Sequence, residues 1–310
     1  MTDYARLIRE KHPVRRSADE KAAFRRSLLA TAEKLGWEAR EGSLDRHERS
    51  RNLIVGDPAA AQVLLTAYYD TPAWSLFPDL RFPGKPWLSL LYIVGQTAAT
   101  LLLAFLTLRG LEALAPLPDR SVLLLFIGLF ISWMLLLNRT FPRRGGSRNT
   151  ADCALALSLM EALQAEDREK AAFLFLDDGE RSSRGGKAWG AAHPDIAWRA
   201  LTLRLDSVGD GHTILLTPQR PALNLPDWET LRAALEDGDG YVLKQAGFLS
   251  TFTRQDRKQL PLSVGLTACR GWYIRPEAVA DPENIAWLTS RLCRWIGSLQ
   301  TEAGAGPAPL

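Results

Sequence analysis

The sequence has few of the residues that build disulfide scaffolds and zinc ribbons. It contains three cysteines, Cys153, Cys269 and Cys293, which are far apart and form no CxxC pair. An odd number of widely spaced thiols argues against a disulfide framework and fits a reducing compartment. Histidine is also scarce, with four residues in a chain of 310.

An excess of charge of either sign is lacking too. The 38 Lys and Arg residues nearly balance the 35 Asp and Glu residues, so the formal net charge is +3. This small charge gives no support for nucleic-acid binding, and we expect no nucleic-acid partner. Residues 1–20 contain no apolar stretch of the kind that forms the centre of a signal peptide, so we expect no cleaved signal.

Two long uncharged runs interrupt this balanced composition. Residues 87–108 and 121–138 contain no charged side chain. Their lengths are about 22 and about 18 residues, and a helix needs roughly 20 apolar residues to cross the core of a bilayer. Two prolines break the linker at residues 109–120, so we predict a transmembrane helical hairpin over residues 86–139. The alternative is a pair of helices buried in a large soluble core.

The cations that flank these runs predict an orientation. The outer flanks carry more Lys and Arg than the linker does, and such flanks stay on the cytoplasmic side of a membrane. We therefore predict an integral protein of the cell inner membrane, with the lipid bilayer as a partner and the soluble domain in the cytoplasm. The outer flanks hold Arg81, Lys85, Arg139, Arg143, Arg144 and Arg148, and the linker holds Arg109 and Arg120.

The remainder of the chain alternates between strand-like and helix-like segments. A capping box from Ser17 to Glu20 opens a helix for which Gly36 is the expected stop. The alternation predicts an α/β fold of three layers, in which helices flank a mixed, mostly parallel sheet. The expected strands lie within 52–56, 62–70, 171–180, 200–216 and 261–270, and the other expected helices within 150–166, 228–235 and 282–300.

These segments divide the chain into parts. Residues 1–85 and 140–300 are predicted to form the two parts of one α/β domain, which the hairpin interrupts. Residues 301–310, rich in Gly, Ala and Pro, are predicted to be a disordered tail.

Three acidic residues mark the predicted site. Sites in mostly parallel sheets lie at the carboxyl ends of the strands. Asp70, Glu180 and Asp206 each follow a predicted strand. We therefore expect them to lie near one another at one edge of the sheet.

Five segments of the chain recur together in one known family. They are LLTAYYDTPA (64–73), GSRNTADCALALSLMEAL (146–163), FLFLDDGERSSRGGKAWG (173–190), LRLDSVGDG (203–211) and VADPENIAWLTSRLCRWI (279–296). In this order and spacing the chain resembles the zinc-dependent aminopeptidases and exopeptidases of the M28 type, over most of its length outside the hairpin. The resemblance implies the zinc-exopeptidase fold, two zinc ions held by His and carboxylate ligands, and a glutamate as general base on a bridging water.

The resemblance also implies a role for each site position, and several positions depart from the family's pattern. The first ligand histidine falls on Tyr68, and a phenol is a poor zinc ligand compared with imidazole. The aspartate that orients this histidine falls on Asp70 and is kept. The general-base glutamate falls on Gly179, which has no side chain. We therefore expect no catalytic residue.

Two of the remaining ligand positions also lack the residue that the family uses to bind metal. The aspartate that bridges both metals falls on Arg148, a permanent cation that repels metal ions. Glu180 and Asp206 keep two carboxylate ligands, whereas residues 273–284, where the last ligand histidine is expected, contain no histidine. We therefore expect no metal, and if one binds, Glu180 and Asp206 are its ligands. His212, six residues after Asp206, is either a rescuing ligand or an exposed turn residue.

Arg148 leads to a specific hypothesis about the emptied site. Carboxylates that face each other without a metal repel one another. A planar guanidinium with five donors can bridge two or more of them. We predict that Arg148 occupies the former metal space and contacts the acidic positions of the site. The alternative is that Arg148 joins Arg143 and Arg144 in a basic patch that faces anionic lipid.

Three functions remain open on the sequence alone. The first is a membrane-anchored M28 peptidase-like protein, catalytically inactive and metal-free, that acts as a binding or scaffold module for a peptide or protein partner. The second is an active zinc-dependent aminopeptidase or metallo-exopeptidase with unconventional ligands. The third is a membrane protein whose hairpin mediates assembly. The missing general base favours the first, because a hydrolase without its base loses orders of magnitude in rate.

Overall fold

One sheet of eight strands forms the centre of the molecule. The strands are β1 (Ala39–Leu44), β2 (Arg51–Val55), β3 (Val63–Tyr68), β6 (Ala171–Leu176), β7 (Leu201–Leu205), β8 (Thr213–Pro218), β9 (Val242–Gln245) and β10 (Ser263–Cys269). Their order is β1-β2-β6-β3-β7-β10-β8-β9. The central strands β6, β3, β7 and β10 run parallel to one another, which confirms the prediction of a mixed, mostly parallel sheet. The computed structural model describes residues 2–44, 51–71, 73–74, 80, 82, 85–114, 119–139, 141–142, 148–179, 183–236, 238–246, 258–271, 273–274 and 280–300.

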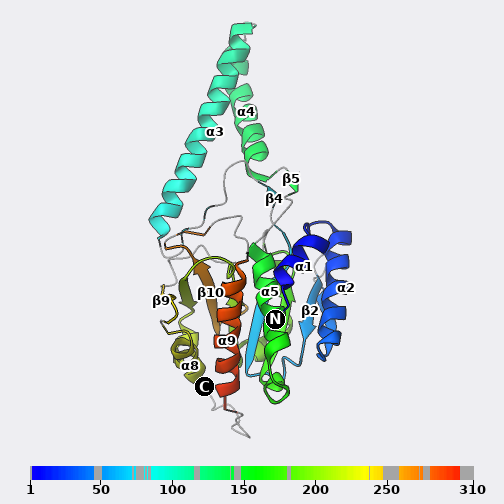
Figure 1. Ribbon diagram of the computed structural model, residues 1–310. Coiled ribbons are helices and arrows are strands. Elements are labelled where there is room, and N and C mark those ends of the chain that lie inside the picture. The colour runs from blue at the N-terminus through cyan, green and yellow to red at the C-terminus, as the bar shows by residue number, and fades with distance from the viewer. Residues whose placement is uncertain are drawn as a thin grey trace.

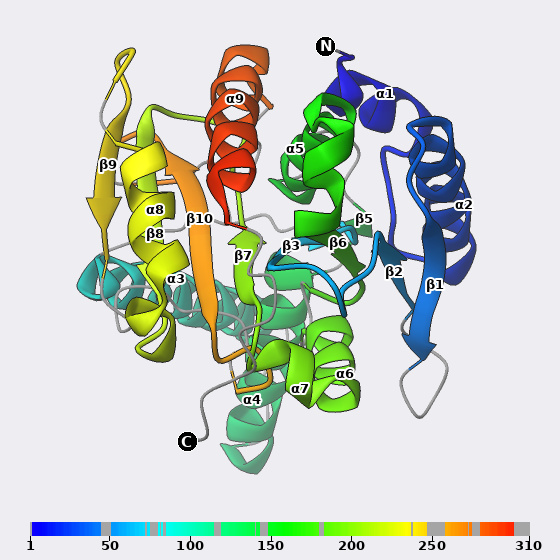
Figure 2. The ribbon, with the colours of Figure 1, turned by 90° about the horizontal axis from the view of Figure 1, so that it is seen from below.

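Helices cover both faces of this sheet, so the body has three layers (Figure 2). The larger core lies on one face, beneath α1, α2, α5, α8 and α9, and the smaller core lies on the other face, beneath α6 and α7. The helices are α1 (Tyr4–Lys11), α2 (Ala18–Lys34), α5 (Arg148–Ala162), α6 (Arg184–Ala192), α7 (Pro194–Ala197), α8 (Pro226–Ala234) and α9 (Pro282–Ser298), with short 3-10 turns at Ala165–Lys170 and Pro221–Asn224.

The helix ends follow the local signals of the sequence. At the start of α2, Glu20 N donates to Ser17 Oγ at 3.2 Å, and Ser17 N donates to Glu20 Oε2 at 2.8 Å. This is the predicted capping box, and Gly36 follows the helix with a φ of +79°. Asp281 caps α9 by accepting a hydrogen bond from Glu283 N at 3.0 Å, and Pro282 occupies its first turn.

Several elements of the body and the pairing of the strands were not predicted from the sequence. The helices α1, α6 and α7 and the strands β1 and β9 were all missed. The strands β2 and β3 are consecutive in the chain, yet β6 lies between them, and β10 lies between β7 and β8 in the same way. These pairings join distant segments, so local patterning contains no signal for them.

Two apolar helices project from the body, α3 (Pro86–Leu114) and α4 (Asp119–Arg139) (Figure 1). Only 11% of the most apolar 18-residue window of α3 is buried, so the alternative of a buried core helix is wrong. Among the described residues α3 alone is long and apolar enough to cross a membrane, because the apolar part of α4, Ser121–Leu137, is shorter.

The two helices contact each other through a narrow stripe. Thr100, Ala104 and Leu108 lie one turn apart on α3 and are buried, as expected for residues at spacing i, i+4 and i+8. Trp133 of α4 donates its indole N–H to Thr107 Oγ1 at 3.0 Å. The other large apolar side chains of α3, such as Leu90, Leu91 and Leu106, are exposed. The hairpin therefore presents apolar surface to its surroundings on most sides.

Candidate functional site

The strand β3 ends in two tyrosines that lie on opposite faces of the sheet, as alternation along a strand requires. Tyr69 packs in the larger core, with its ring 5.9 Å from that of Phe24. Tyr68 packs in the smaller core with Leu176 and Trp189. Tyr68 is only 2% exposed. The residue at the position of the expected ligand histidine is thus a core residue.

Asp70 joins three elements just beyond the end of β3. Its Oδ1 accepts a hydrogen bond from Gly179 N at 2.9 Å, in the turn that follows β6. Its backbone oxygen accepts a hydrogen bond from Asn149 Nδ2 at 2.6 Å, in the first turn of α5. The residue is 4% exposed. Asp70 therefore holds the turn after β6 and the start of α5 against β3.

Gly179 lies directly against the ring of Tyr68. A Cβ atom at position 179 would fall inside the van der Waals envelope of this ring and within 2.7 Å of Tyr68 Cβ. Carbon atoms in contact lie 3.5–4.0 Å apart, so no side chain fits at this position while Tyr68 is present. The two departures from the family's pattern at positions 68 and 179 are therefore sterically coupled.

Asp206 follows β7 in a tight loop that α5 and α9 hold in place. Its Oδ1 accepts a hydrogen bond from Ser207 Oγ at 3.2 Å, and the residue is half-buried. Val208 N donates to Asp152 Oδ1 at 3.0 Å, and Asn284 Nδ2 donates to Val208 O at 2.7 Å. The loop thus fixes Asp206 at the same edge of the sheet as Asp70.

Arg15 is a buried cation beneath this edge that was not predicted from the sequence. It is completely buried, and its guanidinium donates to Tyr69 O at 2.5 Å, to His12 O at 2.8 Å and to Thr150 Oγ1 at 2.9 Å. Burial lowers the pKa of Arg15, while the neighbouring Cys153 and Asp70 act in the opposite direction. A positive charge therefore lies close to Asp70 without any metal.

The turn that carries Gly179 is held by ion pairs beneath α2. Lys21 Nζ lies 2.6 Å from Asp177 Oδ1 and 2.7 Å from Asp178 Oδ1. Asp177 is 1% exposed, and Asp178 has a φ of +52°, a backbone conformation that few non-glycine residues adopt. These ion pairs fix the position of Gly179 beside Tyr68.

Comparisons with known proteins identify the fold. Searches against protein families and curated proteins find no match. Among solved structures, the leucine aminopeptidase precursor of Bacteroides thetaiotaomicron superposes with a TM-score of 0.59 at 12% identity, over 96% of this chain and 95% of that one. The glutaminyl cyclase of Porphyromonas gingivalis superposes with a TM-score of 0.56 at 15% identity, over 95% of this chain and 97% of that one. The chain has the M28-type zinc-exopeptidase fold. At these identities the similarity establishes the fold and no activity.

Within the M28-type fold, two of the predicted site positions lie outside the described residues. Arg148 is the first residue of α5, but its side chain is outside the described part, as is Glu180 as a whole. The prediction that Arg148 bridges the acidic positions stays a prediction. Asp70, Gly179 and Asp206 are described, and they lie at the carboxyl ends of β3, β6 and β7, as the fold implies.

The described residues at the site do not fit the zinc ligand set of the M28-type fold. Zinc in this family needs His and carboxylate donors and a glutamate beside the bridging water. Tyr68 is packed in a core, and the ring leaves no space for a side chain at position 179. Across the described part of the chain, no group of three or more His, Cys, Asp or Glu side chains is placed to hold a metal ion.

Two further candidate residues have simple structural roles. His212 is exposed at the turn before β8, and its ring lies 4.8 Å from that of Tyr241. Cys153 is fully buried near the start of α5, and burial raises the pKa of its thiol to about 12. Such a thiol is not a nucleophile at neutral pH. His212 thus follows the structural alternative predicted from the sequence, and Cys153 is a packed residue of the larger core.

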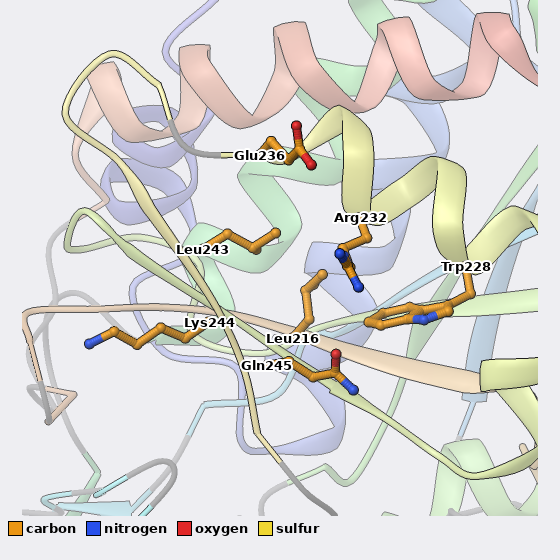
Figure 3. A pocket seen from close by; sticks show the side chains of 7 residues that line it. All are labelled: Leu216, Trp228, Arg232, Glu236, Leu243, Lys244 and Gln245. Atoms are coloured by element: carbon orange, nitrogen blue, oxygen red, sulfur yellow. The ribbon is translucent and has the colours of Figure 1, made fainter.

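A hollow lies away from this site, between α8 and the outer strands β8 and β9 (Figure 3). Its volume is about 460 Å³. In Figure 3 the side chains of Arg232 and Gln245 approach the ring of Trp228, and Lys244 points away. The lining residues are Leu216, Trp228, Arg232, Glu236, Leu243, Lys244 and Gln245. None of them belongs to the predicted site.

Acidification should destabilise the protein through His12, which lies beside Arg15. Burial lowers the pKa of His12 below 6.5, and the charges of Arg15 and Lys11 add to the shift. The stability that neutral His12 contributes is therefore present above about pH 6.5 and is lost as the pH falls from there through the lowered pKa. Thermal unfolding between pH 7.5 and pH 5, roughly spanning the histidine range, should show a smaller loss for His12→Gln. The exposed His212→Gln variant is the control, and an unchanged pH dependence in His12→Gln would contradict the assignment.

Proposed function

We propose that the protein is a membrane-anchored domain of the M28-type fold that binds no catalytic zinc and hydrolyses no peptide, and that acts as a binding or scaffold module for a peptide or protein partner. The observation that carries the proposal is the contact between Gly179 and the ring of Tyr68. It removes the general base and the first ligand position together. Without a base, rates fall by orders of magnitude even where a metal binds.

The position of Arg15 supports a site that is stable without metals. Two acidic side chains near one edge of a sheet raise each other's pKa or destabilise the fold when nothing neutralises them. The buried guanidinium of Arg15 and the carboxylate of Asp70 attract each other. A cation of the chain itself therefore neighbours one of the acidic side chains of the site.

The apolar hairpin supports the anchoring. The helix α3 is long enough to cross a bilayer core, and its large side chains are exposed. In water, exposed apolar surface of this kind promotes aggregation. In a lipid bilayer, apolar side chains are expected on the outside of a helix. With the cationic flanks inside, the body lies on the cytoplasmic side of the cell inner membrane.

An active zinc-dependent aminopeptidase with unconventional ligands is the alternative. Asp206 is half-buried at the site, so a carboxylate ligand is available to such an enzyme. This alternative predicts turnover that depends on an added metal, which the first proposal does not.

The full-length chain, purified from membranes, should hydrolyse no aminoacyl chromogenic substrate when zinc or cobalt is added. It should also fail to cyclise a peptide with an N-terminal glutamine, the reaction that the name of one structural neighbour suggests. An aminopeptidase of known activity in the same detergent serves as the control. Turnover that a chelator abolishes would establish the alternative.

For the anchoring, the chain should remain in the membrane pellet after alkaline carbonate extraction, and its release into the supernatant would exclude a bilayer-spanning hairpin.

A further inference from the structure

Both ends of the helical hairpin join the body at the carboxyl edge of the sheet. The chain enters the hairpin after β3, which ends at Tyr68, and returns to the body at Arg148, where α5 begins. The parallel strands β6, β3, β7 and β10 all end at this edge. Figure 1 shows the hairpin projecting from there, on the side opposite the end of α9. The predicted site and the base of the hairpin thus belong to one surface.

A short ribbon ties the two arms of the hairpin together beside the site. The strands β4 (Ala73–Trp74) and β5 (Phe141–Pro142) pair antiparallel, with Trp74 opposite Phe141. Trp74 follows Asp70 by four residues. Trp87, at the start of α3, is 61% exposed. Trp and Tyr residues concentrate where a membrane meets water, so Trp74 and Trp87 at the base of the hairpin mark the expected level of the interface.

The same region is basic in sequence. Residues 81–85 and 139–144 contain five Lys and Arg residues and no Asp or Glu. Clusters of this size next to a membrane-spanning helix are attracted to anionic phospholipid headgroups. The attraction reaches only about 10 Å at moderate salt, so it acts on the edge of the sheet from which the hairpin emerges.

We propose that the carboxyl edge of the sheet docks on the surface of a membrane that contains anionic phospholipid, with the base of the hairpin in the headgroup layer. The proposal rests on the membrane anchoring proposed above and adds an orientation to it. The edge that carries Asp70, Gly179 and Asp206 faces the bilayer. A molecule that reaches the half-buried Asp206 therefore arrives through the headgroup layer and not from the open cytosol.

Two matched positions on α2 test this orientation. Ala18 and Ala30 are both exposed, and they lie about 18 Å apart along the helix at 1.5 Å per residue. Ala18 lies at the carboxyl edge, next to the loop in which Arg15 O accepts a hydrogen bond from Thr71 N. A spin label is placed at Ala18→Cys or at Ala30→Cys in the full chain, with Cys293→Ser to remove the half-buried native thiol. The chain is reconstituted in nanodiscs of phosphatidylcholine with phosphatidylglycerol, and collision with a nickel-chelating lipid is measured.

The label at position 18 should collide with the nickel lipid several-fold more often than the label at position 30. Equal collision rates in protein that resists carbonate extraction would overturn the docking and leave the anchoring intact. Release of the chain by carbonate would overturn both.

Neutralising two of these cations tests whether anionic phospholipid is the class of lipid that binds. In Arg143→Gln with Arg144→Gln, the collision rate at position 18 should fall toward the rate measured in phosphatidylcholine alone. The control is Lys34→Gln with Arg220→Gln, which removes the same charge from exposed positions at the last residue of α2 and beyond the end of β8 and should leave the rate unchanged. A rate that is the same with and without phosphatidylglycerol would refute the role of anionic lipid.

Discussion

Gly179→Ala should lower the free energy of unfolding by about 1–3 kcal/mol, the usual effect of overpacking a core. The added methyl group would overlap the ring of Tyr68, and this ring is held in the smaller core by Leu176 and Trp189. Gly179 does not have a positive φ, so its backbone accepts alanine and the loss reports the contact alone. Gly179→Glu, which restores the family's residue, should be at least as destabilising.

A double-mutant cycle separates this contact from a general weakness of the turn. In a Tyr68→Gly background, which removes both the ring and the Cβ atom, the methyl group has space, so Gly179→Ala should change the stability little. Gly128→Ala is the control for the substitution itself, because a Cβ at position 128 meets nothing within 4 Å. Chemical denaturation of the purified chain measures all of these variants. An equal loss from Gly179→Ala with and without Tyr68 would refute the coupling of the two positions.

Arg15→Ala should lower the free energy of unfolding by about 3–5 kcal/mol, the range for removing one partner from a buried charged group. Three oxygen acceptors, on Tyr69, His12 and Thr150, would lose their donor in a buried region. The carboxylate of Asp70 would also lose a neighbouring positive charge. Arg15→Lys keeps the charge but loses the planar guanidinium group, so its free energy of unfolding should lie between those of the unmodified protein and Arg15→Ala.

The adjacent residue provides the matched control. Arg16 is half-buried, and Arg16→Ala should change the stability by about 0.5 kcal/mol or less, as most surface substitutions do. The comparison by thermal unfolding uses two arginines that are neighbours in sequence and differ in burial. If both substitutions have the same effect, the buried hydrogen bonds of Arg15 do not stabilise the fold as described.

The class of the fold follows from local signals in the sequence. Buried runs that alternate with amphipathic segments predict a layered α/β domain, and the structure has one. The capping box at Ser17 and the glycine at position 36 place the ends of α2 because their effects are local. The ends of the apolar runs likewise predict where β3, β6 and β7 end. These carboxyl ends place Asp70, Gly179 and Asp206 at one edge of the sheet.

The interior of the site could not be predicted in this way. Arg15 belongs to a polar stretch before α2, and nothing local distinguishes it from the more exposed Arg16. Tyr68 stands at a strand end, and only the packing beneath α6 shows that its ring fills a core. From the sequence, the glycine at position 179 indicates that the general base is missing. The structure adds that this position has no space for a side chain. Each of these facts depends on contacts between distant segments.

The zinc content of the chain, purified from membranes of cells grown with added zinc, tests the central claim most directly. Elemental analysis by mass spectrometry should find far less than one zinc ion per chain, because Tyr68 and Gly179 leave neither the ligand nor the base that the M28-type site needs. Roughly two zinc ions per chain, the number a two-metal hydrolase binds, lost together on substitution of Asp206→Asn, would contradict the account.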